Sequence, residues 1–389
     1  MIFSNNNCNY FLKSVILIYL IIQLIVLIFI QSKFLHKYFD KISFLNNSNN
    51  LNLSESLIKD DPLNEYRLLH KSIIQLKKFP IKVSINGYTA EGYANKMYSV
   101  ITSLVIAILT DSAIVIRWNN IDKFIEEPAY LAFKNYDLEM NELSANYKTE
   151  EIFVPRPAYG WKIEKDMNAL IKTKLPDNKN RFIYNQLIAY FFEICSNPIY
   201  YDKLLYYKLV SKNRIDSANE IISNLNNYTN NVKTNVILDI GYQVGGNLLN
   251  RMWIPKRDLL DLINSYYINH FFGNYVIGIQ IREYYIHENI DLNTFIDCAL
   301  MIEENVKTSL KYNVKFKWFI TSDSKSIIDK LISNHKMNKI IVVANGTIGH
   351  VELDKNAYQR ALIDNELLSK CNEIIITGGS TFGNFFLNY

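Results

Sequence analysis

The stretch YVIGIQIR, residues 275–282, is an apolar run that ends in an arginine. Its β-branched residues are typical of a strand that is buried on both faces of a sheet. Three runs of the same kind follow it: KWFITSD at residues 317–323, KIIVVA at residues 339–344 and EIIIT at residues 373–377. We therefore predict a strand at each of these places.

Helical patterns separate these runs. Apolar residues between Phe295 and Val306 recur at the spacing of one helix face. Further helices are expected after Ser324 and through residues 362–369. Because strands that alternate with helices form parallel sheets, this part of the chain is predicted to be a parallel sheet covered on both faces.

A second unit of this type lies earlier in the chain. IKVSI at residues 81–85 alternates like a strand, a glycine-bearing loop leads into a helix over residues 95–109, and AIVIRW at residues 113–118 reads as a buried strand. The middle, from about residue 128 to residue 270, is rich in aromatic residues and mostly helical in pattern. With two such units the predicted fold is α/β and resembles the GT-B fold, which has two Rossmann-like domains.

The first part of the chain contains a long uncharged apolar segment, residues 15–30. A helix from Phe11 to Ile30 would reach roughly 30 Å, which is the thickness of a bilayer core. A cleavable signal peptide is one alternative, but the small-residue cleavage pattern is missing after Ile30. A buried core helix is the other, but no polar face interrupts the segment. One lysine precedes the segment and Lys33 and Lys37 follow it, so charge alone leaves its orientation open.

The domain order follows from these patterns. A polar, asparagine-rich segment from Ser43 to about Asp61 is typical of a flexible stem. The predicted order is a short tail (1–10), one transmembrane anchor (11–32), the stem (33–79), an acceptor-side α/β domain with a helical insertion (80–270) and a donor-binding Rossmann-like domain (271–389).

Composition limits the class of protein. A hydrophobic content of 49% is enough for a packed core, and a net charge of +4 over 389 residues gives no basic patch for nucleic acid. The cysteines lack the paired spacing of a zinc site and are predicted to be free thiols: Cys8, Cys195, Cys298 and Cys371. Glycosylation sequons, usable if the domain faces the secretory lumen, occur at Asn46, Asn52, Asn227 and Asn345.

Polar groups at the carboxyl ends of parallel strands are the strongest site candidates, because ligands bind there. Arg282 ends the first strand and could bind a pyrophosphate through two parallel hydrogen bonds. The alternative is a surface ion pair with Glu283 or Glu288. The loop TGGSTFG at residues 377–383 offers glycines and hydroxyls for a phosphate, or is only a turn with a helix cap. The segment GYANK at residues 92–96 places an amide and an ammonium at the mouth of the first unit.

In combination these motifs resemble the eukaryotic fucosyltransferase superfamily, closest to the α-1,2-fucosyltransferase type that includes the plant xyloglucan enzymes. The resemblance rests on the ordered motifs from Gly92 to Gly383. It covers the glycine-Asn-Lys motif before an apolar helix, the strand ending in Gln280-Ile-Arg282, the pair Ser322-Asp323 and the final Ser-Thr-Phe-Gly.

The resemblance implies a role for each matched residue. Arg282 would hold the β-phosphate of GDP-fucose and assist its departure as the catalytic residue. Asp364 would help to bind guanosine. The remaining donor-binding residues implied are Gly92, Asn95, Lys96, Ser380, Thr381 and Phe382.

The resemblance also implies an inverting transfer of fucose to a glycan hydroxyl without metal or other cofactor. The chain has no Asp-x-Asp triplet to hold a metal, so arginine and backbone donors would have to neutralise the leaving group. Glu126 and Glu127 are the candidates for a general base, although an exposed acidic turn is the alternative. The expected location is the Golgi or endoplasmic reticulum membrane, as a single-pass type II protein with a signal anchor and a lumenal, glycosylated catalytic domain.

Two departures from the family pattern leave alternatives open. Ala94 stands where a second glycine is usual, and the chain stops at Tyr389, whereas family members generally continue, so a fragment or a compromised copy is expected. An inactive glycan- or nucleotide-binding relative is therefore one alternative. A transferase for another sugar nucleotide is a second, because such contacts read phosphates and not the sugar.

Overall fold

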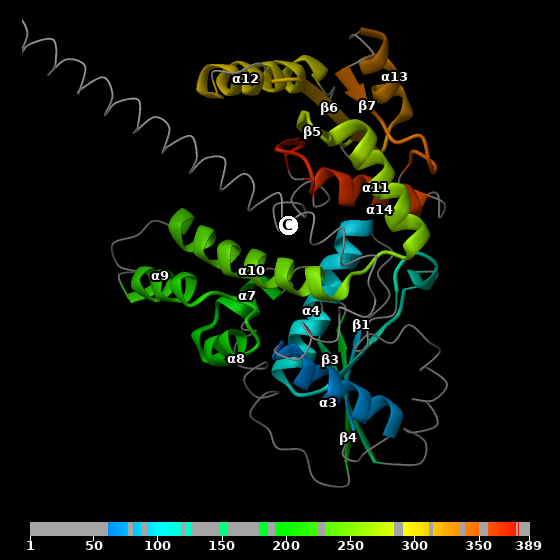
Figure 1. The fold of residues 1–389 in the computed structure, drawn as a ribbon. Coiled ribbons are helices and arrows are strands. Elements are labelled where there is room, and N and C mark those ends of the chain that lie inside the picture. The colour runs from blue at the N-terminus through cyan, green and yellow to red at the C-terminus, as the bar shows by residue number, and fades with distance from the viewer. Residues whose placement is uncertain are drawn as a thin grey trace, which may run out of the picture. The chain divides into compact units, whose positions relative to one another are not determined.

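The computed structural model gives the arrangement of most of the predicted α/β region (Figure 1). Within residues 61–389 the segments described are 61–76, 81–86, 92–118, 121–126, 148–154, 179–185, 191–223, 230–283, 291–310, 314–334, 339–349, 357–378 and residue 380. Residues 65–389 form one compact unit, which contains both sheets.

The first sheet has four parallel strands in the order β2-β1-β4-β3. Its two central strands are the buried β1 and the later β4, so the sheet joins segments far apart in the chain. The strand bounds are β1 Lys82–Asn86, β2 Ala113–Ile116, β3 Thr149–Val154 and β4 Asn180–Asn185. The predicted strands at residues 81–85 and 113–118 are thus confirmed as β1 and β2.

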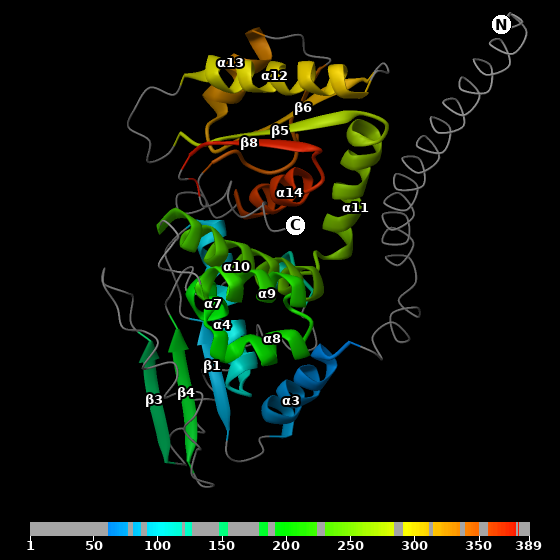
Figure 2. The same ribbon diagram turned by 90° about the vertical axis from the view of Figure 1, so that its left-hand side faces the viewer.

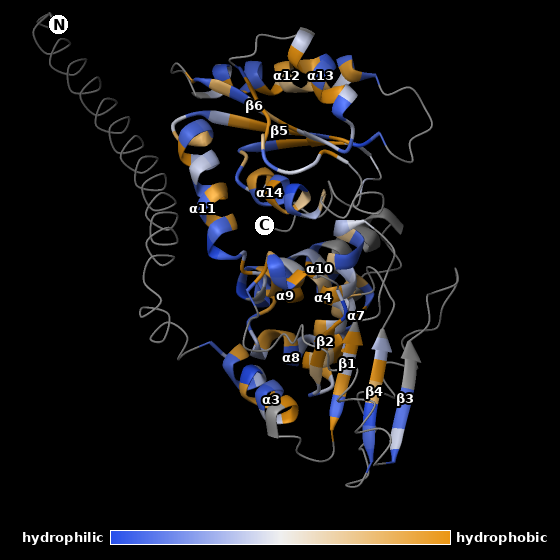
Figure 3. Ribbon diagram, turned by 90° about the vertical axis from the view of Figure 1, so that its right-hand side faces the viewer, coloured by the Kyte–Doolittle hydropathy of each residue, from blue (hydrophilic) through white to orange (hydrophobic). Residues whose placement is uncertain are grey.

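Helix α4, Tyr93–Leu109, is the main cover of this sheet and packs on β1 and β2. Almost every one of its residues is buried, which agrees with the apolar run that predicted it. Figure 3 shows this apolar character along α4 and β1. The helix begins at the mouth of the sheet, so its N-terminal turn is available to line a site.

Helix α3, Leu63–Leu76, corrects the predicted extent of the stem, which was drawn to residue 79. Two of its side chains are buried and bond to the chain around β2. The Tyr66 hydroxyl donates to the carbonyl of Ser112 at 3.0 Å, and His70 Nε2 donates to the carbonyl of Ile114 at 3.1 Å. The sequence pattern did not predict this helix, because a partly polar helix next to a polar linker has no clear boundary.

The burial of His70 should make stability depend on pH. Burial lowers the pKa of His70 to about 4, so the unfolded chain takes up a proton between about pH 6.5 and pH 4 that the folded chain does not. Stability is therefore expected to fall by roughly 3 kcal/mol over this range. His70→Gln keeps an N–H donor for Ile114 and should lose this component, as measured by thermal unfolding at several pH values. Parallel curves for the two proteins would contradict the prediction.

The described residues in the middle of the chain are mostly helical, as their pattern predicted. Strands β3 and β4 also lie in this region and were not predicted. A group of helices lies beside α4 in Figure 1, and two of them, α7 and α10, contact it. The group is α7 Phe191–Ser196, α8 Tyr201–Tyr206, α9 Lys212–Ser223 and α10 Asn230–Met252. Helix α11, Arg257–Tyr266, instead contacts α14, Ala357–Leu368. Short 3-10 turns lie at Ile121–Lys123 and Pro198–Tyr200. A π-helical turn, Tyr267–Phe271, follows α11.

The second sheet also has four parallel strands, in the order β7-β6-β5-β8. Its strands are β5 Tyr275–Ile281, β6 Phe316–Ser322, β7 Ile340–Ile341 and β8 Glu373–Ile376. All four predicted strands are present, but β7 is shorter than the run that predicted it. Strand β5 is an interior strand of this sheet, and Arg282 directly follows it. Arg282 therefore lies near the middle of the row formed by the carboxyl ends of the strands.

Helices cover both faces of the second sheet, as predicted for a parallel sheet. Figure 2 shows α12, Leu292–Leu310, and α13, Lys325–Asn334, on one side of the strands and α14, Ala357–Leu368, on the other. The core between the strands and α12 and α13 includes Ile279, Ala299 and Ile328.

The membrane anchor predicted at residues 11–32 lies outside the described residues, as do the tail and most of the stem. Within the described segments, none of the helices combines the length and the apolar character needed to cross a membrane. Cys195 is a buried free thiol as predicted, and Cys298 and Cys371 are free but only partly buried.

Candidate active site

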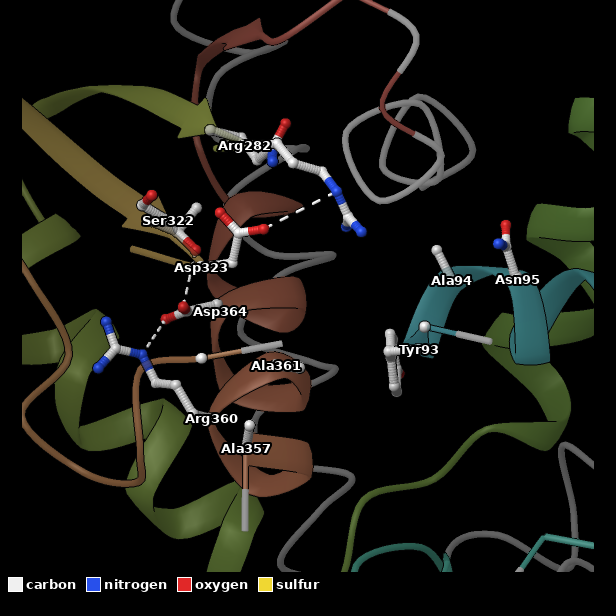
Figure 4. Close-up of a pocket in the computed structure, with 14 residues that line it drawn as sticks. Tyr93, Ala94, Asn95, Arg282, Ser322, Asp323, Ala357, Arg360, Ala361 and Asp364 are labelled. Carbon is white, nitrogen blue, oxygen red and sulfur yellow. Dashed lines mark hydrogen bonds and ion pairs between the residues drawn. The ribbon is translucent and has the colours of Figure 1, made fainter. Parts of the chain in front are cut away.

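A pocket lies between the N-terminal turn of α4 and the carboxyl ends of β5 and β6. Figure 4 shows Tyr93, Ala94 and Asn95 on one side and Arg282 and α14 on the other. The pocket is lined by Gly92, Tyr93, Ala94, Asn95, Gln280, Arg282, Thr321, Ser322, Asp323, Gly349, Ala357, Arg360, Ala361 and Asp364.

The start of α4 presents a positive electrostatic end to this pocket. Gly92 caps the helix in an extended conformation with no side-chain cap, and the first turn contains no acidic residue. The backbone N–H groups of the first turn are therefore not neutralised by a local carboxylate, and such a helix end favours an anion. Asn95 adds a side-chain oxygen that is buried and has no hydrogen-bond partner within the described residues.

Arg282 supplies the positive side chain on the opposite wall. It follows the last residue of β5, and its backbone N–H donates to Thr377 Oγ1 at 2.9 Å. Its Nε lies 3.8 Å from Asp323 Oδ2, with the Arg282 side chain 20% exposed. The alternative ion pair predicted with Glu283 is thus replaced by one with Asp323, while Glu288 lies outside the described residues.

Asp323 fixes the backbone next to Arg282. Its Oδ1 accepts a hydrogen bond from the backbone N–H of Glu283 at 2.9 Å, while Oδ2 faces Arg282. The carboxylate therefore joins the ends of β5 and β6. At a distance of 3.8 Å the Asp323 carboxylate partly neutralises the charge of the Arg282 guanidinium.

Asp364 is buried in the wall formed by α14. Its Oδ2 accepts from Thr321 Oγ1 at 2.7 Å, and its Oδ1 accepts from Arg360 Nε at 2.8 Å. Arg360 also donates to the carbonyl of Val343 at 2.7 Å. Burial raises the pKa of Asp364, and the neighbouring Arg360 and Thr321 act in the opposite direction. Both oxygens thus have partners in the chain, and Asp364 still lines the pocket.

Lys96 is not among the residues that line the pocket. Its Nζ donates to the hydroxyl of Tyr358 on α14, and it lies 5.0 Å from the Tyr358 ring centroid and 5.6 Å from that of Trp118. The two rings pack edge to face at 6.0 Å. Lys96 is therefore held in an aromatic cluster that links α4 to α14, and not among the groups facing the pocket.

Removing the Tyr358 hydroxyl should loosen this link. Tyr358→Phe keeps the ring that faces the Lys96 ammonium but loses the hydrogen bond, and bonds to charged groups contribute about 1.5–3 kcal/mol. We expect urea unfolding to show a loss of roughly 2 kcal/mol. In the background of Lys96→Met the same change should cost much less. An equal loss in both backgrounds would show that the hydroxyl acts independently of Lys96.

The other predicted site residues fall elsewhere or outside the described segments. Ser380 is buried and donates its backbone N–H to Thr377, but it is not among the residues that line the pocket. Glu126 is exposed, and its N–H donates to the carbonyl of Ile254 at 2.8 Å. Asn345 is exposed, as a glycosylation site requires. Those outside the described residues are Thr381, Phe382, Glu127, Asn46, Asn52 and Asn227.

Two residues that line the pocket, Arg360 and Gln280, were given no role in the site by the sequence analysis. Arg360 precedes Asp364 by four residues on α14, a spacing that could have predicted their ion pair but not its burial. Gln280 was part of a motif without a role, and its side-chain oxygen is buried and lacks a hydrogen-bond partner within the described residues. Such oxygens can accept hydrogen bonds from ligand N–H or O–H groups.

Comparisons with known proteins place the fold but no sequence family. No family model matches the chain, and no curated protein matches it. A variant of the fucosyltransferase FUT1 from Arabidopsis thaliana, solved with GDP, is similar at a TM-score of 0.51 and 14% identity, over 84% of this chain and 76% of that one.

Two further solved structures match with lower scores. The fucosyltransferase NodZ from Bradyrhizobium has a TM-score of 0.44 at 15% identity, over 80% of this chain and 93% of that one. POFUT1 in complex with GDP has a TM-score of 0.40 at 8% identity, over 79% of this chain and 93% of that one. The likeness to the plant protein shows that the two chains share a fold. The predicted α/β fold of the GT-B type is therefore confirmed for the described region.

Proposed function

We propose that this chain is a glycosyltransferase that transfers fucose from GDP-fucose to a hydroxyl of a glycan. The observation that carries the proposal is the position of Arg282 across the pocket from the uncapped start of α4. Two sources of positive potential on opposite walls suit a diphosphate, whose charge is spread over several oxygens. The structure of the similar plant fucosyltransferase contains GDP, which supports the choice of nucleotide.

The proposed reaction inverts the anomeric carbon and uses no metal. The acceptor hydroxyl oxygen attacks that carbon from the face opposite the diphosphate. The bond between carbon and phosphate oxygen breaks with its electron pair staying on GDP, and the hydroxyl proton passes to a base, for which Glu126 and Glu127 stay the candidates. Arg282 and the α4 N–H groups would stabilise the charge that develops on GDP, since preorganised donors are most effective where charge appears.

Among the described residues no cluster of His, Cys, Asp and Glu side chains is arranged to hold a metal ion. This finding leaves the question of a metal to experiment. We propose that transfer proceeds equally well in the presence of a chelator, because Arg282 and the helix end supply the positive charge that a divalent cation would otherwise provide.

The remaining donor contacts are proposed from their places in the pocket. Asn95 would bond a phosphate or a ribose hydroxyl through its amide. Asp364 and Gln280 would face the nucleoside end, where Gln280 offers an acceptor without a partner among the described residues. Ser380 and Thr381 would approach the diphosphate from the loop after β8.

We also propose the location that the sequence predicts. The anchor at residues 11–32 would hold the chain in the Golgi or endoplasmic reticulum membrane with its α/β domains in the lumen. Asn345 would then be available for glycosylation, together with Asn46, Asn52 and Asn227. Loss of mass after glycosidase treatment, abolished when all four asparagines are replaced by glutamine, would test the orientation.

The central experiment offers the full-length chain, purified in detergent, a panel of nucleotide sugars with a mixture of glycan acceptors. GDP-fucose should be the donor consumed, with release of GDP and formation of a fucosylated product, with or without chelator. Calorimetry with GDP, UDP and CMP should show tight binding of GDP alone. Preference for UDP or CMP sugars would refute the proposed donor.

Ala94 favours one alternative function, an inactive relative that binds a nucleotide or glycan. It lines the pocket, and its methyl group occupies space near the start of α4 where a glycine would leave room for a phosphate. GDP binding without any transfer would favour this alternative. Ala94→Gly should then increase GDP affinity, whereas in an active transferase it should leave affinity nearly unchanged.

A further inference from the structure

Thr377 lies directly after β8 and beside the end of β5. Its backbone N–H donates to the carbonyl of Gln280 at 3.1 Å, and its hydroxyl lies 3.2 Å from the same carbonyl oxygen. The same hydroxyl oxygen accepts the backbone N–H of Arg282 at 2.9 Å. Because a hydroxyl has one proton and two lone pairs, it can donate to Gln280 and accept from Arg282 at the same time.

The sheet explains why a side chain is needed at this point. The pairing of β5 with β8 ends at Gln280 and Ile376. If the pairing continued, a backbone carbonyl of the neighbouring strand would accept the N–H of Arg282. Here the Thr377 hydroxyl accepts it instead. Thr377 is only 8% exposed, so this contact is shielded from water. A buried N–H that loses its acceptor is costly, which makes the hydroxyl a strong determinant of the local backbone.

Asp323, which follows the neighbouring strand β6, restrains the backbone of Glu283, the residue after Arg282. Asp323, after β6, accepts the N–H of Glu283 at 2.9 Å. The backbone at residues 282 and 283 is therefore bonded to both neighbouring strands, by Thr377 on one side and Asp323 on the other. The Asp323 carboxylate also faces the Arg282 side chain, whereas the Thr377 hydroxyl bonds the backbone N–H of Arg282 and the backbone carbonyl of Gln280.

We propose that Thr377 is a positioning residue for Arg282. Its hydroxyl fixes the point at which the Arg282 side chain leaves the sheet and enters the pocket. Thr377 itself is not among the residues that line the pocket, so it acts through Arg282. The consequence for transfer rests on the proposed function, whereas the consequence for the backbone of residue 282 does not.

The test compares Thr377→Val with Thr377→Ser in the full-length chain. Valine keeps the shape and loses the hydroxyl, and serine keeps the hydroxyl and loses the methyl group. We expect Thr377→Val to lower kcat at least about tenfold, because small displacements of a catalytic group reduce rates strongly. KM for the acceptor should change little, and Thr377→Ser should stay within about threefold of the wild-type kcat. Equal losses in both variants, or none in either, would overturn the proposal.

Hydrogen–deuterium exchange gives a readout that does not depend on any nucleotide. In the wild-type chain the Arg282 amide should be protected like that of Ile281, although it lies beyond the strand. Protection should be lost in Thr377→Val and kept in Thr377→Ser. An unprotected Arg282 amide in the wild type would overturn the proposal even if Thr377→Val failed to fold. If the wild type bound no GDP, the proposed function would fail, and the exchange data would still decide the role of Thr377.

Discussion

Arg282→Ala is expected to lower the transfer rate roughly 10²–10³-fold, the usual effect of removing one preorganised donor from an active site. Arg282 directly follows β5, an interior strand of the sheet, and its side chain lines the pocket opposite α4. Without it, the start of α4 alone would face the charge that develops on the leaving diphosphate. GDP affinity should fall at least about tenfold, because one charge-assisted pair is lost. Initial rates with GDP-fucose and calorimetry with GDP measure the two effects.

Arg282→Lys is the matched control. Lysine keeps the charge but cannot form two parallel hydrogen bonds, so it should restore part of the GDP affinity and little of the rate. Asp323→Asn tests the neighbouring carboxylate, and its effect on GDP affinity should be much smaller than that of Arg282→Ala. Unchanged GDP affinity in Arg282→Ala would remove Arg282 from the donor site.

The strands of the second sheet could be predicted because each coincides with a short run made up mostly of β-branched and aromatic residues. The run at residues 339–344 shows where this reasoning ends, since only Ile340–Ile341 form the strand β7. The carbonyl of Val343 accepts from Arg360, and the N–H of Ala344 donates to the hydroxyl of Tyr266 at 2.7 Å. These side-chain partners come from distant elements, and no local pattern contains them.

The strands missed in the middle of the chain have a different cause. β3 and β4 contain charged residues at their starts, so neither reads as a continuous apolar run. In the sheet, Arg181 on β4 donates to Glu150 on β3 at 2.9 Å. The charges are thus paired across neighbouring strands. Only knowledge of the pairing could have turned these polar residues into a signal for a sheet.

The candidate site shows the same division. Gly92, Asn95 and Arg282 were predicted from motifs at strand and helix ends, and Asp364 was implied by the family resemblance. All four line one pocket. Lys96 belongs to the same motif as Asn95 but packs in the cluster with Tyr358. Adjacent residues on a helix point about 100° apart. A motif therefore predicts where the backbone of both residues lies, but only one of the two side chains faces the ligand.

Arg360→Met is expected to lower the free energy of unfolding by roughly 3–5 kcal/mol, the usual cost of leaving one member of a buried ion pair without the other. The side chains of Arg360 and Asp364 are each only 4% exposed. Arg360 also bonds the carbonyl of Val343, so the change releases two partners. Gly346, which has a φ of +82°, packs closely against Arg360. This close packing leaves the surrounding chain little room to adjust when Arg360 is replaced. Urea unfolding of the full-length chain measures the loss.

The pH dependence and a double variant separate the ion pair from simple packing. Burial already raises the pKa of Asp364, and Arg360 opposes that rise. In Arg360→Met the pKa should rise further, so the folded state holds its proton more tightly and stability falls as pH increases. The deficit relative to wild type should therefore be larger near neutral pH than near about pH 5. Adding Asp364→Asn should recover part of the loss, because the unpaired buried charge is then gone. A deficit independent of pH, with no recovery in the double variant, would show that Arg360 stabilises the fold by packing alone.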